Sequence, residues 1–368
     1  MALRYEVFLN EHICYLPLMK HFKFYSKEDI LSLTRVRRFE TRVGERINYL
    51  KGNKEWPAVL EESTARYVLI GIPEDIGVKA NYGVGGSDTV WIPFLSAFLN
   101  VKSNDYFSGE EILLLGHFDF GDIKYLIENT AYNDEEKIDA YRHALQIIDD
   151  EVEQLIKAIA SCNKIPLVIG GGHNNSYPII KGVAKGLYKA DKLPLSQINC
   201  INLDAHPDYG ASEGRHSGNG FRYAEEDGYL GKYCIIGLHE NYISQNVLMD
   251  IHNNPFLDYI SYEEIFIHER KNFIQAVAHA TGFTEDSMTG IELDLDSIEN
   301  ALSSAATPCG ISVLQARHYM NFTATDAKVA YLHICEGASQ LADGRKDETT
   351  GKLISYLVSD FVKAHLQD

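Results

Sequence analysis

The sequence predicts an α/β protein in which a mainly parallel sheet lies between two layers of helices. Short apolar runs alternate along the chain with longer segments of helical periodicity. Strands of a parallel sheet are buried on both faces, so they read as nearly continuous apolar runs. Acidic and histidine side chains also cluster directly after or within three of these runs. Functional sites of such sheets form beyond the carboxyl ends of the strands, which agrees with this placement.

The elements follow in order along the chain. Apolar runs predict strands at 67–70, 112–115, 165–169, 198–203, 233–236, 290–295 and 329–334. Helical patterns intervene at about 135–161, 175–189, 262–281 and 349–366, with apolar residues of the first recurring mostly at spacings of three and four. Residues 1–62 lack this rhythm and are predicted to form an N-terminal extension packed on a domain of residues 63–368.

The net charge, the cysteine spacing and the hydropathy of the whole chain exclude some classes of partner and compartment. The 368 residues carry a formal charge of −18, which argues against a nucleic-acid partner. The six cysteines form no C-x-x-C pair, so free thiols in a reducing compartment are the simplest interpretation. No signal peptide and no apolar span of about 18 residues is visible, and a cytoplasmic protein without a membrane partner is therefore expected. A homo-oligomer is left open.

The stretch Asp204-Ala205-His206-Pro207-Asp208 directly follows an apolar run. Side chains at i, i+2 and i+4 of a strand point the same way, so its two aspartates and its histidine converge. A fully extended span of this length is roughly 13 Å, too long for one ion. A bent strand end would suit two ions about 3.5–4 Å apart. A solvated turn is the alternative.

Two further segments favour a metal site. Three glycines, Gly170 to Gly172, bring the chain to His173 at the end of another run, and the absence of a following Lys-Ser/Thr disfavours a phosphate loop. Glu292, Asp294 and Asp296 alternate on one strand face, where like charges repel unless a cation neutralises them. An edge strand with a wet face is the alternative. Carboxylates with imidazoles, and no thiolate, favour Mn²⁺ or a similar divalent ion.

These three segments resemble the ureohydrolase superfamily of arginases, agmatinases and formimidoylglutamases. The family motifs G-G-[DG]-H, D-A-H-x-D and D-x-D appear here in the same order, within a resemblance that covers about residues 66 to 366. The resemblance implies an arginase-like three-layer sandwich, a ureohydrolase-like catalytic domain at 63–368, and two Mn²⁺ ions, with other divalent ions as alternatives. The implied ligands of one ion are His173, Asp204, Asp208 and Asp294, and those of the other are Asp204, His206, Asp294 and Asp296.

A metal pair of this kind explains hydrolysis, because two ions lower the pKa of a bridging water enough to give hydroxide near neutral pH. Glu336 matches the glutamate of the family that faces the substrate, and it would pair with a cationic amidine or guanidine. The Asn-Pro that usually follows this glutamate is replaced here by Gly337-Ala338. The alternative for Glu336 is a solvated acid at a strand end.

The loop after the second motif is similar to the substrate-reading loop of the family. Ser217 and Asn219 match the arginase version, whereas Phe221-Arg222 and Gly172 resemble formimidoylglutamases. All three polar residues, Ser217, Asn219 and Arg222, are candidate substrate ligands, with Arg222 pairing bidentately with a substrate carboxylate. A surface salt bridge is the alternative for Arg222.

Arginases carry a proton-shuttling histidine where this chain has Phe221, and His216 is a candidate replacement catalytic residue, with a solvated loop histidine as the alternative. Three functions remain. The leading hypothesis is hydrolysis of N-formimidoyl-L-glutamate to glutamate and formamide. The second is an arginase or other guanidino hydrolase that releases urea, and the third is a catalytically silent metal-binding or regulatory relative.

Overall fold

The computed structural model describes residues 19–50 and 56–367; residues 1–18 and 51–55 of the predicted extension lie outside this part. In the described residues, nine strands form one sheet in the order β1-β3-β2-β4-β9-β8-β5-β6-β7. The strands are β1 Phe22–Phe24, β2 Tyr67–Gly71, β3 Ile112–Phe118, β4 Ile165–Ile169, β5 Ile198–Leu203, β6 Leu230–Leu238, β7 Leu257–Ser261, β8 Thr289–Asp294 and β9 Val329–Cys335. Every pairing is parallel except that of β1 with β3.

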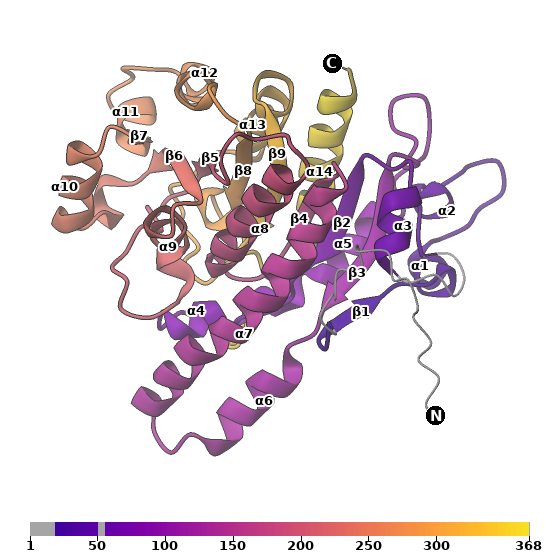
Figure 1. Ribbon diagram of the computed structural model, residues 1–368, viewed down its shortest axis with the longest axis horizontal. Coiled ribbons are helices and arrows are strands. Elements are labelled where there is room, and N and C mark those ends of the chain that lie inside the picture. Colours follow the sequence, from indigo (N-terminus) through magenta and orange to yellow (C-terminus); the bar gives the residue numbers. More distant parts are fainter. Residues whose placement is uncertain (1–18, 51–55, 368) are drawn as a thin grey trace, which may run out of the picture.

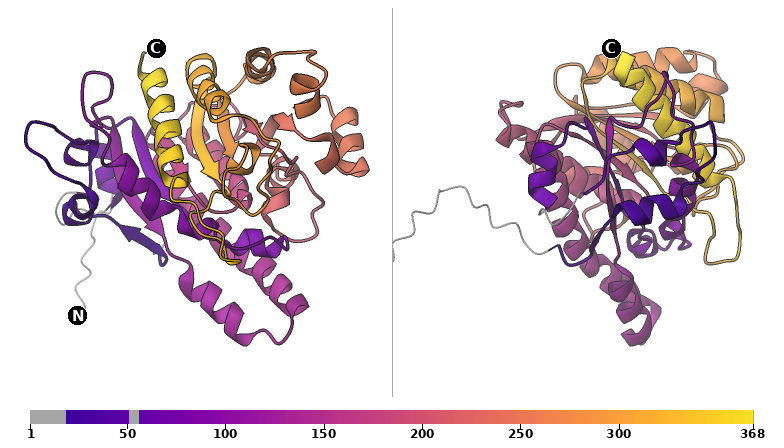
Figure 2. Two further views of the ribbon diagram at one scale, coloured as in Figure 1. Left: turned by 180° about the vertical axis from the view of Figure 1, so that it is seen from behind. Right: turned by 90° about the vertical axis from the view of Figure 1, so that its right-hand side faces the viewer.

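Helices cover both faces of this sheet, which confirms the predicted three-layer α/β/α architecture (Figure 1). One face packs against α5 (Trp91–Phe98), α12 (Phe273–Thr284), α13 (Val313–Asp326) and α14 (Thr350–Gln367). The other packs against α7 (Asp134–Ser161), α8 (Ser176–Lys189), α9 (Gly220–Glu226) and α10 (Gln245–Asn253). Seen from behind, α14 (yellow) lies in front of the sheet (Figure 2). Successive strand residues serve opposite cores: Leu69 packs in the first, Val68 and Ile70 in the second.

Six further helices complete the described part of the chain. They are α1 Lys27–Leu33, α2 Val43–Arg46, α3 Trp56–Glu62, α4 Ile76–Ala80, α6 Gly121–Thr130 and α11 Tyr262–Phe266. Single turns of 3₁₀-helix include η2 His173–Asn175, η3 Ser217–Asn219, η4 Glu240–Tyr242 and η5 Leu295–Ser297. Three of these turns carry predicted site residues: η2 begins at His173, η3 contains Ser217 and Asn219, and η5 contains Asp296.

The seven predicted strands are confirmed, and β1 and β7 are additional. The single helix predicted for 262–281 is wrong, because the structure has two helices there. The first, α11, ends at Phe266, and Glu269 takes a positive φ of 51° between them. Asn272 then caps α12 by accepting the Gln275 N–H, while the Gln275 side chain accepts the Asn272 N–H. The new cap breaks what the apolar periodicity presents as one helix.

The described part of the N-terminal extension contributes to the sheet. Strand β1 pairs with β3 at the edge, and the hydroxyl of Tyr25 accepts the indole N–H of Trp91 at 3.0 Å. The boundary between an extension and a domain near residue 62 stays a prediction. The cysteines in the described residues are all free. No helix in the same residues combines the length and apolarity that crossing a membrane requires.

Candidate metal centre

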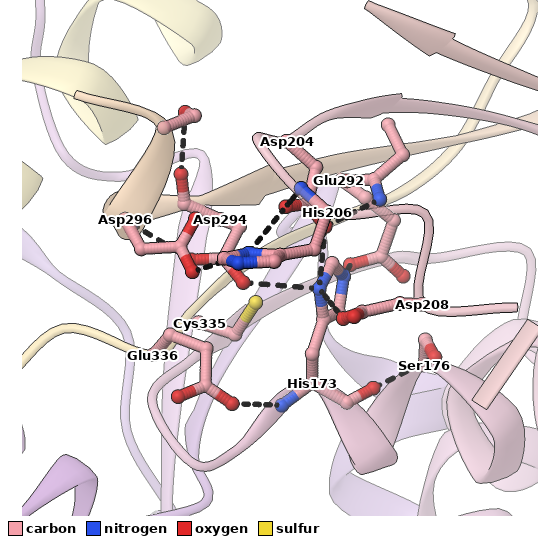
Figure 3. A network of polar contacts seen from close by, with 12 residues as sticks. His173, Ser176, Asp204, His206, Asp208, Glu292, Asp294, Asp296, Cys335 and Glu336 are labelled. Carbon is pink, nitrogen blue, oxygen red and sulfur yellow. Dashed lines mark hydrogen bonds and ion pairs between the residues drawn. The ribbon is translucent and has the colours of Figure 1, made fainter. Parts of the chain in front are cut away.

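Four central strands, β4, β9, β8 and β5, are consecutive neighbours and parallel, so their carboxyl ends lie together at one edge of the sheet. The chain reaches His173 after β4, Asp204 to Asp208 after β5, Asp294 at the end of β8, and Glu336 after β9. Side chains from separate stretches therefore meet at this edge (Figure 3).

The first donor set consists of His173, Asp204, Asp208 and Asp294. The Nδ1 atom of His173 lies 3.2 Å from an oxygen of Asp204, 2.8 Å from one of Asp208 and 3.2 Å from one of Asp294. All four residues are buried, and neither ring nitrogen of His173 makes a hydrogen bond in the described part of the chain. A buried imidazole nitrogen without a hydrogen bond, facing carboxylate oxygens, fits a divalent cation.

The second donor set consists of Asp204, His206 and Asp296, and it shares Asp204 with the first. The Nδ1 atom of His206 lies 3.0 Å from an oxygen of Asp296 and 3.8 Å from one of Asp204. Within each set, one donor atom per residue lies within 4.8 Å of all the others. Asp294 groups with the first set, and its Oδ1 accepts the backbone N–H of Asp296 at 2.8 Å. Its expected contact with a second ion stays a prediction.

The electrostatics of the two sets indicate that they need a cation. Burial, followed by the charges of Asp296 and Asp204, raises the pKa of Asp294 well above its usual range. Burial and the charge of Asp204 likewise raise the pKa of Asp208 to about 6. Burial alone would lower the pKa of His206, but the carboxylates of Asp296, Asp204 and Asp208 together outweigh it and raise that pKa to about 11. Crowded buried carboxylates of this kind are relieved by bound divalent ions.

The backbone at the site holds rare conformations. Asp208 and Glu336 have positive φ angles of 43° and 60°, which non-glycine residues adopt mostly where the surrounding structure imposes them. Gly171 has a φ of 81°, and a Cβ there would lie 2.5 Å from the Asn175 amide nitrogen and 2.7 Å from the Ile72 carbonyl oxygen. Only glycine fits this turn, which aims the following His173 at the site.

A cavity of about 210 Å³ opens beside both donor sets. Its walls combine their carboxylates with Glu336 and with the neutral side chains of Asn81, Ser217 and Ser304. The Oε1 atom of Glu336 accepts the backbone N–H of His173 at 2.8 Å, and burial raises the pKa of Glu336 to about 8. The structure thus brings together the six predicted metal ligands, Glu336 and Ser217.

His216 lies outside the walls of this cavity. It caps η3, since its Nδ1 accepts the backbone N–H of Gly218 at 3.1 Å. Burial lowers the pKa of its imidazole to about 4. The structure therefore does not support a proton shuttle at His216, and it does not support the solvated histidine either, because the side chain is buried.

Two predicted substrate ligands also lie elsewhere. The buried amide of Asn219 accepts from Arg215 and from the His216 N–H, and it donates to two carbonyl groups of the same loop. Arg222 forms an ion pair with Asp250, and its guanidinium lies 4.2 Å from the Tyr209 ring centroid. These contacts agree with the alternative for Arg222, the salt bridge, and its role in substrate binding stays a prediction. The sequence pattern could not show that Arg222 on α9 faces Asp250 on α10.

Two buried glutamates support the site and were not predicted in those roles. Glu74 accepts the backbone N–H of Gly172 at 3.0 Å and the amide of Asn175 at 2.7 Å, so it holds the glycine-rich loop. Glu292 lies in β8 behind His173. The sequence held one indication of the position of Glu292, namely the alternation that places it on the same strand face as Asp294.

A larger cavity, of about 300 Å³, lies at the carboxyl ends of β2 and β3. Its lysine, Lys124, donates to Asp75 at 2.9 Å and to Asp88 at 2.7 Å. These carboxylates are thus neutralised by a side chain of the protein, unlike those of the two donor sets. The smaller cavity, which no lysine or arginine of the described residues lines, is therefore the better candidate for a metal site.

Comparison with known proteins agrees with this geometry. The model of the arginase family matches residues 65–362, and the chain belongs to this family. Among curated relatives, it is similar to the formimidoylglutamase of Macrococcus caseolyticus, with 29% identity over 216 residues that cover 57% of this chain and 65% of that protein. A formimidoylglutamase of Streptococcus pyogenes is 25% identical over 193 residues, which cover 49% of this chain and 57% of the relative. The matches thus span less than two thirds of either relative.

Solved structures show the same fold. The formimidoylglutamase of Bacillus subtilis superposes with a TM-score of 0.67 at 17% identity, covering 91% of this chain and 95% of the other. The formiminoglutamase of Trypanosoma cruzi, solved with Mn²⁺, gives a TM-score of 0.65 at 20% identity, with 88% and 98% covered. A hypothetical agmatinase of Burkholderia thailandensis gives 0.63 at 14% identity, with 89% and 90% covered.

Proposed function

We propose that this protein is a hydrolase with two divalent metal ions that cleaves a C–N bond of a linear amidine, with N-formimidoyl-L-glutamate as the first candidate substrate. The observation that carries the proposal is the pair of donor sets joined by Asp204, the first fully buried and the second buried except for His206, beside a cavity that also holds Glu336. Mn²⁺ is the ion of choice, because the donors are carboxylates and imidazoles and a similar fold is solved with Mn²⁺. The products would be glutamate and formamide.

The ligands of one ion are His173, Asp204, Asp208 and Asp294, and those of the other include Asp204, His206 and Asp296. Two Mn²⁺ ions there would supply a nucleophilic water near neutral pH and would polarise the amidine carbon. Glu336 points one oxygen at the His173 backbone, which leaves the other for a cationic nitrogen of the substrate. Ser217 and Asn81 offer neutral hydrogen bonds to the rest of the substrate.

The curated relatives favour the formimidoyl substrate. One observation favours the second candidate, a guanidino hydrolase that releases urea. In the described residues, no lysine or arginine lines the cavity, so the two carboxylates of N-formimidoyl-L-glutamate would meet only neutral donors. A substrate with a shorter or less charged tail fits that lining equally well. We place the activity in the cytoplasm, in keeping with the free cysteines.

The test is an assay of the Mn²⁺-loaded protein for formamide and for urea, with N-formimidoyl-L-glutamate, arginine and agmatine as substrates. We expect formamide from the first and no urea. Efficient urea release would replace the first candidate by the second. Full metal occupancy without turnover of any substrate would leave the silent relative.

The matched variant is Glu336→Gln, which keeps the shape of the side chain. We expect kcat to fall by about 10²–10³-fold, the size of effect seen when one charge-stabilising group is removed from an active site. Its metal content should stay unchanged, because Glu336 is in neither donor set.

A further inference from the structure

Glu292 is a fully buried carboxylate in the central strand β8, beneath the first donor set. Its Oε1 accepts the hydroxyl of Tyr331 at 2.6 Å, and its Oε2 accepts the Nδ1–H of His333 at 2.6 Å. Strands β8 and β9 pair Glu292 directly with His333. The carboxylate therefore has a fixed position, held by two buried side chains of the neighbouring strand.

The same carboxylate faces His173 from the side opposite the donor set. Its Oε2 lies 3.5 Å from the Nε2 atom of His173, whereas Nδ1 of that ring faces Asp204, Asp208 and Asp294. Figure 3 shows Glu292 beside the ring of His173. When Nδ1 is a metal ligand, the proton of the neutral imidazole must be on Nε2, where Glu292 is the carboxylate within reach.

We propose that Glu292 is the positioning residue of His173. Once Nδ1 binds an ion, Glu292 would accept the Nε2–H of the ring across the 3.5 Å that separates the two atoms in this structure. It would thereby fix the tautomer and the ring orientation in which the Nδ1 lone pair points into the first donor set. Tyr331 and His333 in turn hold the carboxylate in place. Partners of this kind raise the basicity of a metal-binding histidine, and their removal typically weakens metal binding 10–100-fold. The inference rests on the proposed metal centre.

A third metal site is the competing explanation for this cluster. His173, Glu292, His333 and Cys335 offer donor atoms within 4.8 Å of one another. However, His333 already donates to Glu292, and the thiol of Cys335 donates to the Leu293 carbonyl oxygen at 3.6 Å. An ion would have to displace both protons, so the hydrogen-bonded arrangement is the simpler account of these contacts.

The decisive variant is Glu292→Gln, which preserves shape but removes the charge and one of the two acceptor oxygens. Mn²⁺ titration, followed by the EPR signal of the free ion, measures each binding step without any assay of activity. We expect two steps in the wild type. In the variant, one step should weaken by about 10–100-fold and the other should stay within about threefold, because only the first set contains His173.

Two tyrosine variants serve as a matched pair. Tyr331→Phe removes a hydrogen bond to the Glu292 carboxylate, and we expect the same step to weaken to a smaller extent. Tyr319→Phe removes hydrogen bonds from another buried tyrosine to the carbonyl oxygens of Ile201 and Glu292, but none to the carboxylate. It should leave both steps unchanged. In the Zn²⁺-loaded wild type, ¹⁵N NMR should show His173 protonated at Nε2, with a slowly exchanging proton that Glu292→Gln loses.

The outcomes separate the inference from the proposed function. A wild-type protein that binds no pair of ions refutes the metal centre itself. If the wild type binds two ions and Glu292→Gln binds both with unchanged affinity, only the positioning role is overturned. Equal weakening of both steps, accompanied by a lower melting temperature, would indicate a purely structural residue. A third equivalent of tightly bound metal that depends on His333 would replace the proposal by a metal site at this cluster.

Discussion

Asp204 is the carboxylate that both donor sets share. Its Oδ2 lies 3.2 Å from the Nδ1 of His173, while its Oδ1 lies on the side of His206 and accepts the His206 backbone N–H at 2.7 Å. The amide of Asn202 donates to Oδ2 at 2.9 Å and fixes the plane of the carboxylate. A buried carboxylate with two such faces is suited to hold two cations at once.

We therefore expect Asp204→Asn to lose metal as well as activity. Both affinities should fall by more than about 100-fold, because even the hydrogen-bond partners of metal ligands are worth 10–100-fold. Elemental analysis after gel filtration measures the bound metal. The control is Asp286→Asn, since Asp286 pairs with Lys232 away from both sets. Retention of both ions by Asp204→Asn would show that this residue is not shared.

Arg222 supports local packing in the structure, so the expected effect of Arg222→Ala is on stability. The side chain is 17% exposed, pairs with a half-exposed Asp250 and lies over the Tyr209 ring. We expect a loss of about 1 kcal/mol in the free energy of unfolding, the combined size of a partly exposed ion pair and a cation–π contact. KM for the preferred substrate should change by less than about twofold. A large rise in KM, measured by steady-state kinetics, would support the substrate-binding role instead.

At the scale of elements, the site depends on how four strand-end loops are shaped. The glycine-rich loop after β4 is the most constrained of them, because its backbone approaches Ile72 closely at Gly171 and its far side is held by Glu74. Asp208 and Glu336 add strained backbone to the loops after β5 and β9. Such strain persists where surrounding contacts over-determine a conformation, which is common at functional sites.

Gly171→Ala should therefore displace the loop and weaken metal binding at the first donor set. The matched control is Gly228→Ala, which has a similar φ of 80° but open space around the added Cβ. Each substitution should destabilise the protein by about 1–2 kcal/mol through backbone strain alone. Gly171→Ala should lose more, because its Cβ has no room, and it alone should lose metal in the Mn²⁺ titration. Equal behaviour of the two variants in thermal melts and titrations would contradict this account.

At the scale of the whole molecule, the carboxylates of the site lie together at the carboxyl ends of the central strands, and all of them are buried. Without bound cations, their mutual repulsion opposes folding. The ions are therefore expected to stabilise the whole fold as well as to serve the reaction.

Removal of metal by EDTA should lower the melting temperature, and Mn²⁺ should restore it. An ion at 100 times its dissociation constant contributes about 2.7 kcal/mol, which corresponds to a shift of about 3–4 °C for a chain of 368 residues. Differential scanning calorimetry at several Mn²⁺ concentrations gives the measurement, with Asp204→Asn as the insensitive control. A melting temperature that ignores both EDTA and Mn²⁺ would contradict the metal centre.

The sequence by itself determined the seven main strands and indicated that the six predicted ligands lie close together. Both depend on local information: a strand buried on both faces must be apolar along its length, and residues two apart at its end must point the same way. Because parallel strands end at a common edge, motifs after 165–169, after 198–203 and within 290–295 could be expected to meet.

Only the tertiary structure decided which polar side chains reach the cavity and which bind other parts of the protein. His216, Asn219 and Arg222 lie in one short segment with Ser217, yet only Ser217 reaches the cavity. Of the other three, His216 caps η3, Asn219 donates to a carbonyl group of its own loop, and Arg222 pairs with Asp250. Glu292 likewise has the same face as Asp294 but is engaged by Tyr331 and His333 of the next strand. Buried polar groups bind whichever partner the packing brings close. For Arg222 and Glu292 those partners are 28 to 41 residues away in the sequence, beyond the reach of a local pattern.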